Sequence, residues 1–122
     1  MIRGIGVDTA TVSRIEKSME NPHFCQRVFA PQELAALQAH RRPAPHAAAL
    51  WAAKEALGKA LGEGLSAFEL TEAAVLHDEK GAPYFVFTGA LAEKTAGLTA
   101  HLSLTHEGDC ATAFVVLEDA GH

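Results

Sequence analysis

The sequence predicts an α+β fold in which an antiparallel sheet has helices packed on one side. One alanine- and leucine-rich stretch, residues 46–61, has the composition of a long helix. The second half of the chain contains several short stretches of β-branched and aromatic residues instead. Two of these flank Glu107-Gly108-Asp109 and alternate as the strands of a hairpin do. Antiparallel strands with helices gathered on one side are typical of the α+β class.

The length and composition of the chain favour one domain that spans residues 1–122. With 122 residues, 48% of them hydrophobic, the chain can bury one core but not two independent ones. Lys54 and Glu55 interrupt the longest apolar stretch, which therefore falls short of the roughly 20 residues that span a bilayer. Residues 1–5 lack the plan of a signal peptide. We therefore expect a cytoplasmic protein without a membrane partner.

The formal net charge of −5 argues against nucleic acid as a partner, but the charge is unevenly distributed along the chain. Residues 1–61 contain eight basic and five acidic residues, whereas residues 62–122 contain two basic and ten acidic ones. The first half is therefore the candidate side for binding an anion. The alternative, that halves of the sequence do not correspond to halves of the surface, stays open at this point.

The first 30 residues predict a strand followed by a helix. Ile2–Val7 is apolar and contains two glycines, which indicates a short buried strand with Asp8 at its end. Thr9 or Thr11 can cap the helix that follows. Asn21-Pro22 is expected to end that helix.

Two more helices are expected before residue 64. One begins at Pro31, with Glu33 in its electropositive first turn. Residues 41–45 contain two prolines and form a connector. The long helix of residues 46–61 follows, and the glycines of residues 62–64 end it.

The second half of the chain predicts strands separated by short connections. The expected strands are Ala73–His77, Tyr84–Thr88, Ala100–Thr105 and Ala111–Leu117, with a turn at Lys80–Pro83 and a short helix at Ala90–Ala96.

Asp8 is the first candidate for a functional side chain. A carboxylate at the end of a buried strand is held rigidly while its oxygens reach solvent. Aspartate also caps helices, which stabilises them by about 1 kcal/mol, and this position alone does not exclude that purely structural role.

Glu55 and Lys59 are four residues apart and share one face of the long helix. Such a pair ordinarily stabilises an exposed helix by about 0.2–0.5 kcal/mol and does nothing more. This helix is otherwise mostly apolar, however, and Gly58 in its interior predicts either a packing contact or room for a ligand. His106 opens a turn, where an imidazole can reach a cleft and titrate near neutral pH.

Four segments together resemble the holo-acyl-carrier-protein synthase family of 4′-phosphopantetheinyl transferases. These are GIGVDTATVSRIEK from Gly4, RVFAPQEL from Arg27, WAAKEALGKALGEG from Trp51 and LSLTHEGDCATAFVV from Leu102. Their order and spacing also match, and they cover nearly the whole chain. The resemblance implies the 4′-phosphopantetheinyl transferase fold and the transfer of phosphopantetheine from coenzyme A to a serine of an apo acyl carrier protein.

The resemblance also implies a set of site residues. A Mg²⁺ ion would be held by Asp8 and Glu55, which suits a cation that prefers oxygen ligands. Lys59 would bind the phosphates of coenzyme A, and His106 would contact the cofactor or the adjacent phosphates. Glu55, through a water on the ion, is the first candidate to take the proton of the serine; Lys59 or an unassisted water remains open.

The partners implied by the resemblance are coenzyme A, an acidic carrier protein and two further copies of the chain. Arg14, Lys17 and Arg27 would form the docking face for the carrier. Members of this length resemble homotrimers whose sites lie between neighbours, with Asp8 and Glu55 either on adjacent subunits or facing a shared cleft. The resemblance implies fatty acid biosynthesis, while fatty-acid and polyketide carriers both remain open as acceptors.

Two departures from the family pattern affect these expectations. Thr9-Ala10-Thr11 stands where the family often has an acidic residue, and Leu50 stands where it commonly has an arginine. A phosphate contact must then come from elsewhere, for which Arg41 and Arg42 are candidates. Two other functions also fit: a coenzyme A sensor without turnover, and a metal-dependent phosphoanhydride hydrolase.

Overall fold

The computed structural model describes residues 1–120, which form two antiparallel sheets and five α-helices. The strands are β1 (Ile2–Thr11), β2 (Ala73–His77), β3 (Pro83–Phe87), β4 (Leu98–Glu107) and β5 (Cys110–Asp119). The helices are α1 (Val12–Ser18), α2 (Pro22–Val28), α3 (Pro31–Ala39), α4 (Ala44–Ala60) and α5 (Gly89–Lys94). One sheet has the order β1-β5-β4, and the other pairs β2 with β3.

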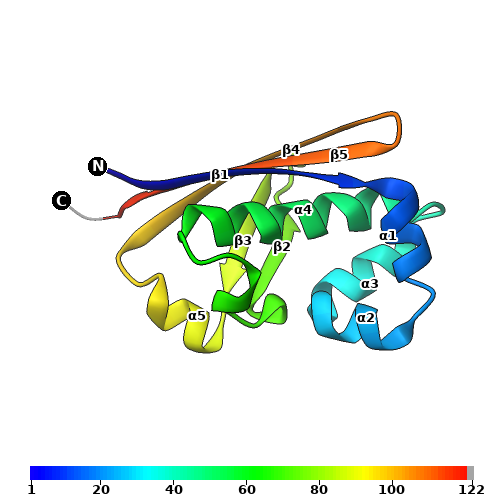
Figure 1. The fold of residues 1–122 in the computed structure, drawn as a ribbon, viewed down its shortest axis with the longest axis horizontal. Helices are drawn as coiled ribbons and strands as arrows, with labels where there is room; N and C mark the ends of the chain where they lie inside the picture. The colour runs from blue at the N-terminus through cyan, green and yellow to red at the C-terminus, as the bar shows by residue number, and fades with distance from the viewer. Residues whose placement is uncertain (121–122) are drawn as a thin grey trace.

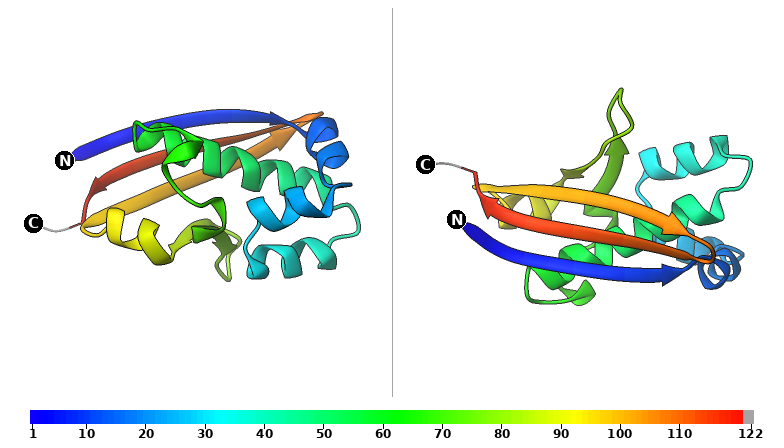
Figure 2. Two further views of the ribbon diagram at one scale, coloured as in Figure 1. Left: turned by 60° about the horizontal axis from the view of Figure 1, so that its bottom comes forward. Right: turned by 90° about the horizontal axis from the view of Figure 1, so that it is seen from above.

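All helices lie on one side of the three-stranded sheet, as the sequence predicts. Figure 1 shows α4 running along this sheet, with α1–α3 near one end and α5 near the other. The sheet forms an outer layer, and the right-hand view of Figure 2 shows the β2–β3 hairpin projecting beyond its β4 edge. No helix within residues 1–120 is long and apolar enough to cross a membrane.

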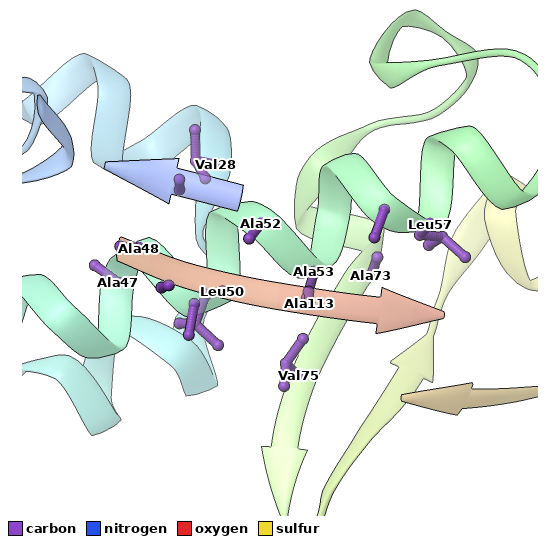
Figure 3. Close-up of a cluster of buried hydrophobic side chains, with 14 of the residues drawn as sticks. Val28, Ala47, Ala48, Leu50, Ala52, Ala53, Leu57, Ala73, Val75 and Ala113 are labelled. Atoms are coloured by element: carbon purple, nitrogen blue, oxygen red, sulfur yellow. The ribbon is translucent and has the colours of Figure 1, made fainter. Parts of the chain in front are cut away.

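The core is built around α4, whose small side chains allow close packing. Alanines at eight positions between 44 and 60 of this helix are buried, together with Leu50 and Leu57. Figure 3 shows part of this cluster, in which α4 contacts Ala113 of β5 and Val75 of β2. Leu50 is fully buried in the core, so it offers no contact to a phosphate.

β1 approaches α4 so closely that only glycine fits at two positions. A Cβ atom at Gly4 or Gly6 would overlap the carbonyl oxygen of Ala60 or Ala56, respectively. Since these are backbone atoms, they cannot move aside as a flexible side chain would. The glycines of this strand therefore set the distance between β1, which carries Asp8, and the helix that carries Glu55.

A fully buried ion pair ties α4 to the rest of the helical layer. Lys54 Nζ lies 2.9 Å from Glu33 Oε1 and also donates to the carbonyl oxygens of Leu70 and Ala73. Glu33 in turn accepts from the backbone N–H groups of Ala30 and Val75. Every polar atom of the pair is thus used, which is the condition under which charges are tolerated in a core.

The first strand differs from its prediction in length and in burial. It extends to Thr11, so Asp8 lies within the strand and not at its end. Only Gly6 and Ala10 are buried, and the side chains of Ile2, Ile5 and Val7 are exposed. The prediction of a short buried strand is wrong because apolar composition alone does not tell whether one face or both faces are covered.

Helix α2 was not predicted, because Asn21-Pro22 signals both a helix end and a helix start. α1 ends at Ser18, as expected from this dipeptide. The Asn21 side chain then accepts a hydrogen bond from the N–H of His23 at 2.9 Å, and Pro22 occupies the first turn of α2. In the same way Pro45, expected in a connector, lies in the first turn of α4.

The predicted hairpin is present and has a further role. Glu107 pairs with Cys110, and Gly108 has a φ of 58°, which suits the first central position of a two-residue turn. The next residue, Asp109, accepts hydrogen bonds from the backbone N–H and the hydroxyl of Ser13. The hairpin tip therefore caps α1, whose own N-cap residue Thr11 makes no side-chain cap bond.

Candidate functional site

Asp8 and Glu55 meet in one cleft, within a single chain. The cleft has a volume of about 400 Å³ and lies between β1, α1 and α4. Its walls are Asp8, Thr9, Ala10, Thr11, Arg14, Ile15, Ser18, Phe24, Trp51 and Glu55. Of the two arrangements left open by the sequence, the structure therefore has both carboxylates facing a shared cleft.

The cleft makes ionisation of the Glu55 carboxyl group less favourable. Burial raises the pKa of Glu55 above its ordinary value, and the negative charge of Asp8 and a hydrogen bond to it raise the pKa further. A hydrogen bond from Trp51 and the positive charge of Lys59 act in the opposite direction. Two acids held this close favour a cation between them, because a cation removes the repulsion that raises the pKa.

Lys59 binds Asp8 and not Glu55. Its ammonium group lies 2.9 Å from Asp8 Oδ1 and donates to the carbonyl oxygen of Val7 at 3.1 Å. The structure gives no ion pair between Lys59 and Glu55 among residues 1–120, so the simple helix-surface pair does not form. The Lys59 side chain remains 55% exposed, which leaves it accessible to an anionic ligand.

The donor set of this cleft fits Mg²⁺ better than a metal that needs a closed protein cage. Residues 1–120 contain no group of three or more His, Cys, Asp or Glu side chains that could hold a metal ion by themselves. Mg²⁺ is commonly bound through one or two carboxylates, with waters and substrate phosphates as its other ligands. Asp8 and Glu55 supply those two carboxylates, and the neighbouring Lys59 suits a phosphate.

Of the predicted docking residues, Arg14 contributes to the cleft itself. Lys17 is exposed one turn further along α1. Arg27 lines an adjoining pocket of about 450 Å³, which shares Phe24 and Trp51 with the carboxylate cleft. The three basic residues therefore lie on α1 and α2, in or next to two pockets that adjoin each other.

His106 and Arg42 do not reach this cleft within one chain. Both line a different cavity of about 400 Å³, together with His46 and Ala49 of α4. The two cavities have no lining residue in common, and Trp51 and Glu55 of α4 face the other one. The phosphate-binding set of Lys59, His106 and Arg42 is therefore split between two places on the chain.

Of the two expectations for Gly58 the structure supports the packing contact, and it adds Trp51, a residue to which sequence reasoning assigned no role. A Cβ atom at Gly58 would lie 2.7 Å from the backbone carbon of Gly64, so this glycine serves packing and leaves no room for a ligand. Trp51 forms a wall of the cleft and contacts Glu55. The four-residue spacing between Trp51 and Glu55 was the available signal, because side chains so spaced share a helix face.

Comparisons with known proteins identify the family of the chain. Residues 4–115 match the 4′-phosphopantetheinyl transferase superfamily. The holo-[acyl-carrier-protein] synthase of Treponema denticola is 44% identical over 123 residues, which cover 97% of this chain and 99% of that protein. The corresponding protein of Aromatoleum aromaticum is 43% identical, with 97% and 98% of the two chains covered.

Solved structures give the same result for the fold. The crystal structure of holo-[acyl-carrier-protein] synthase from Neisseria meningitidis has a TM-score of 0.89 and 34% identity, and covers 98% of this chain and 100% of its own. The synthase from Bacillus anthracis, in complex with CoA (3′,5′-ADP), has a TM-score of 0.86 and 31% identity, with 98% and 99% covered. The chain therefore belongs to the holo-[acyl-carrier-protein] synthases of the 4′-phosphopantetheinyl transferase superfamily.

Proposed function

We propose that this chain transfers 4′-phosphopantetheine from coenzyme A to a serine of an apo acyl carrier protein, using a Mg²⁺ ion held by Asp8 and Glu55. The activity itself is that of its family, a phosphopantetheinyl transferase of the holo-[acyl-carrier-protein] synthase type. The observation that supports the metal assignment is the pair of carboxylates in one cleft, with the pKa of Glu55 raised and Lys59 beside Asp8.

The reaction is a displacement at phosphorus. The serine oxygen forms a bond to the phosphorus that bears pantetheine, and the bond from that phosphorus to the bridging oxygen breaks. Adenosine 3′,5′-bisphosphate leaves with the electron pair. The ion, when bound, would neutralise negative charge that builds up on the transferring and leaving groups.

The chain's own residues then have distinct tasks. Lys59, half exposed and already near the carboxylates, binds a phosphate of coenzyme A and holds it against the cleft. Glu55 accepts the proton of the attacking serine, directly or through a water, and a carboxylate whose pKa is raised is better suited to this than an ordinary one. Trp51, one turn before Glu55 on α4, forms the adjoining wall of the cleft.

The split between the two cavities favours an oligomer. If coenzyme A contacts Lys59 and also Arg42 and His106, the latter two come from a neighbouring copy of the chain. The outer face of the three-stranded sheet is suited to such a contact, because Ile5, Val7 and Phe114 are 61%, 54% and 46% exposed there. We propose a homotrimer with its sites between neighbouring subunits.

The carrier protein would dock on the basic region of α1 and α2. Arg14 borders the cleft, and Lys17 and Arg27 extend positive charge away from it. An acidic partner is steered and oriented by such a surface. The cytoplasmic location expected from the sequence stays a prediction.

The decisive experiment is to incubate the purified protein with coenzyme A, Mg²⁺ and an apo carrier protein and to weigh the carrier by intact-mass spectrometry. We expect the carrier to gain one phosphopantetheine, and we expect EDTA to abolish the gain. Asp8→Asn and Glu55→Gln should each lose at least about a hundredfold in rate while remaining folded. His23→Asn, an exposed change on α2, is the matched control.

The alternatives give different results in the same assay. A double variant of Asp8 and Glu55 with full activity would overturn the metal assignment. Binding of coenzyme A without transfer to any of several carriers would favour a sensor. Release of adenosine bisphosphate without a carrier would favour a hydrolase.

A further inference from the structure

Three histidines from separate elements stack in a row beside the second cavity. His40 follows α3, His46 is in the first turns of α4, and His77 ends β2. The ring centroids of His40 and His46 are 4.6 Å apart, with an angle of 24° between the planes. Those of His46 and His77 are 5.3 Å apart, at 38°. The row thus joins the end of α3, the start of α4 and the end of β2.

The charged and titratable side chains that line the cavity beside this row are all basic. All three histidines contribute to it, and so do Arg42 from the connector and His106 from β4. No Asp or Glu of the described residues 1–120 lines it, and none of the three stacked histidines forms an ion pair there. The remaining lining residues are Pro45, Ala49, Leu104 and Thr105, which carry no charge.

The central histidine is kept neutral by its surroundings. Burial, together with the positive charges of His40 and His77, lowers the pKa of His46 to about 4. Positive charge on either neighbouring ring therefore disfavours a proton on His46. An anion in the cavity would offset this effect.

We propose that His40, His46 and His77, together with Arg42 and His106, form a proton-dependent binding site for a phosphate group. The site takes up protons when the phosphate binds, so that its affinity rises as the pH falls. Resting on the function proposed above, the occupant is a phosphate of coenzyme A, and the three histidines become determinants of how coenzyme A binding responds to pH.

The chemistry of histidine accounts for the direction of this effect. Histidine changes charge between about pH 5 and pH 8, whereas the arginine in the cavity is cationic throughout. A bound phosphate stabilises the imidazolium form and so raises the proton occupancy of the row. By linkage, for each proton that is taken up on binding, the affinity for the phosphate rises about tenfold when the pH falls by one unit.

The test is isothermal titration of the protein with coenzyme A, in EDTA and in two buffers that differ in heat of ionisation. The buffer dependence of the heat gives the net number of protons taken up. Repeating it between about pH 6 and about pH 8 gives the change in affinity. The variant is His40→Asn with His77→Asn, two exposed positions outside the core, and His23→Asn is the matched control.

We expect the wild-type protein and His23→Asn to take up more protons than the double variant, and their affinity to rise about tenfold more between the two ends of the pH range. The comparison removes the titration of the ligand's own phosphate, which is common to all three proteins. Equal proton uptake in wild type and double variant overturns the proposal. So does the absence of coenzyme A binding by the wild-type protein at low pH.

The outcome is separable from that of the proposed function. Phosphopantetheine transfer in the mass-spectrometric assay, together with equal proton uptake, would overturn the histidine site and leave the transferase intact. Conversely, no transfer together with a histidine-dependent proton uptake would leave an anion site on a protein that is not a transferase. A thermal melt of the double variant shows whether it remains folded.

Discussion

The side chain of Glu55 lies where a negative charge is unfavourable in the absence of a cation. Burial and the nearby Asp8 carboxylate both raise its pKa above the ordinary value of 4.5. Its contribution to stability is therefore fully present below pH 4.5 and is lost as the pH rises through the raised pKa. A residue that suits metal binding and proton transfer thus makes the metal-free protein less stable at neutral pH.

Glu55→Gln is expected to raise the melting temperature of the metal-free protein near neutral pH while it abolishes transfer. The substitution removes the unfavourable charge and leaves the ion pair of Asp8 with Lys59 intact. The gain should stay below about 1 kcal/mol, because Glu55 is partly exposed and solvent screens it. Thermal melts in EDTA across the pH range should show the gain disappear near pH 4.5.

Added Mg²⁺ provides the control for this prediction. It should stabilise the wild-type protein and have little effect on Glu55→Gln, because a ligand stabilises only the form that binds it. If the melting temperatures of Glu55→Gln and the wild-type protein differed by the same amount at every pH, the charge of Glu55 would not be the cause of the difference.

The buried pair of Glu33 and Lys54 is a residue-scale feature of a different kind. Burial lowers the pKa of Lys54, and the charge of Glu33 opposes that effect. Glu33→Gln removes this compensation and should destabilise the protein by about 3–5 kcal/mol, measured by urea unfolding. The double variant Glu33→Gln with Lys54→Met should lose much less than the two single variants together, because it leaves no unpaired charge.

An exposed pair elsewhere in the chain is the matched control. Lys94 Nζ lies 2.6 Å from Glu63 Oε1, but both side chains are largely solvated. Glu63→Gln should cost no more than about 1 kcal/mol. Equal costs for the buried and the exposed pair would contradict the assigned role of burial.

At the level of elements, the contact between β1 and α4 fixes the geometry of the cleft. Asp8 lies on the strand and Glu55 on the helix, and Gly6, two residues before Asp8, lies against the backbone of Ala56, the residue after Glu55. The distance between the two carboxylates therefore depends on a residue that has no side chain.

Gly6→Ala is expected to destabilise the protein by about 1–3 kcal/mol, because the added methyl group must push the strand away from Ala56. The same displacement moves Asp8 relative to Glu55, so transfer should require more Mg²⁺ for half-maximal rate. Unfolding by urea and a Mg²⁺ titration of the transfer rate measure the two effects. If neither the urea concentration at half unfolding nor the Mg²⁺ concentration at half-maximal rate changed, the close contact between β1 and α4 would not be needed for stability or for the site.

The elements that the sequence predicted best are those with a strong local signal. α4 has the composition of a helix along its length, and the hairpin at Gly108 has both alternation and a turn. α2 was missed because Asn21-Pro22 has two meanings, and the exposure of β1 could not be inferred from its apolar composition. Local patterns specify elements better than they specify what covers them.

The carboxylate cleft could be predicted from the sequence, but the row of histidines could not. Asp8, Glu55 and Lys59 followed from the resemblance of their segments to a family, and the structure brings them together. The histidine row gave no signal, because its members lie in segments far apart in the sequence and meet only after folding. No spacing rule within one helix or strand can find such a group.

On the scale of the whole molecule, one face of the three-stranded sheet has no covering layer within the chain. The helices lie on the opposite side, as Figure 1 shows. Ile5, Val7 and Phe114 project from this uncovered face and are about half exposed. Alternate residues of a strand face opposite sides of its sheet, so these apolar side chains form one surface.

Phe114→Asp is expected to convert the proposed homotrimer into a monomer that keeps its fold. A carboxylate on this surface would have to be desolvated in the assembly, whereas in the monomer it faces water. Light scattering coupled to size exclusion should give the mass of one chain, about 12.9 kDa, for the variant and three times that mass for the wild-type protein. Far-ultraviolet circular dichroism reports whether the fold is retained.

The same variant tests why assembly would matter for the reaction. Arg42 and His106 line a cavity separate from that of Asp8 and Glu55, and we propose that one coenzyme A contacts both sets only when they come from neighbouring subunits. Phe114→Asp should therefore lose transfer even though its carboxylate cleft is intact, and it should still be stabilised by Mg²⁺. Ala36→Asp, which adds the same charge at an exposed position of α3, should remain trimeric and active. A monomeric Phe114→Asp with full activity would show that one chain holds the complete site.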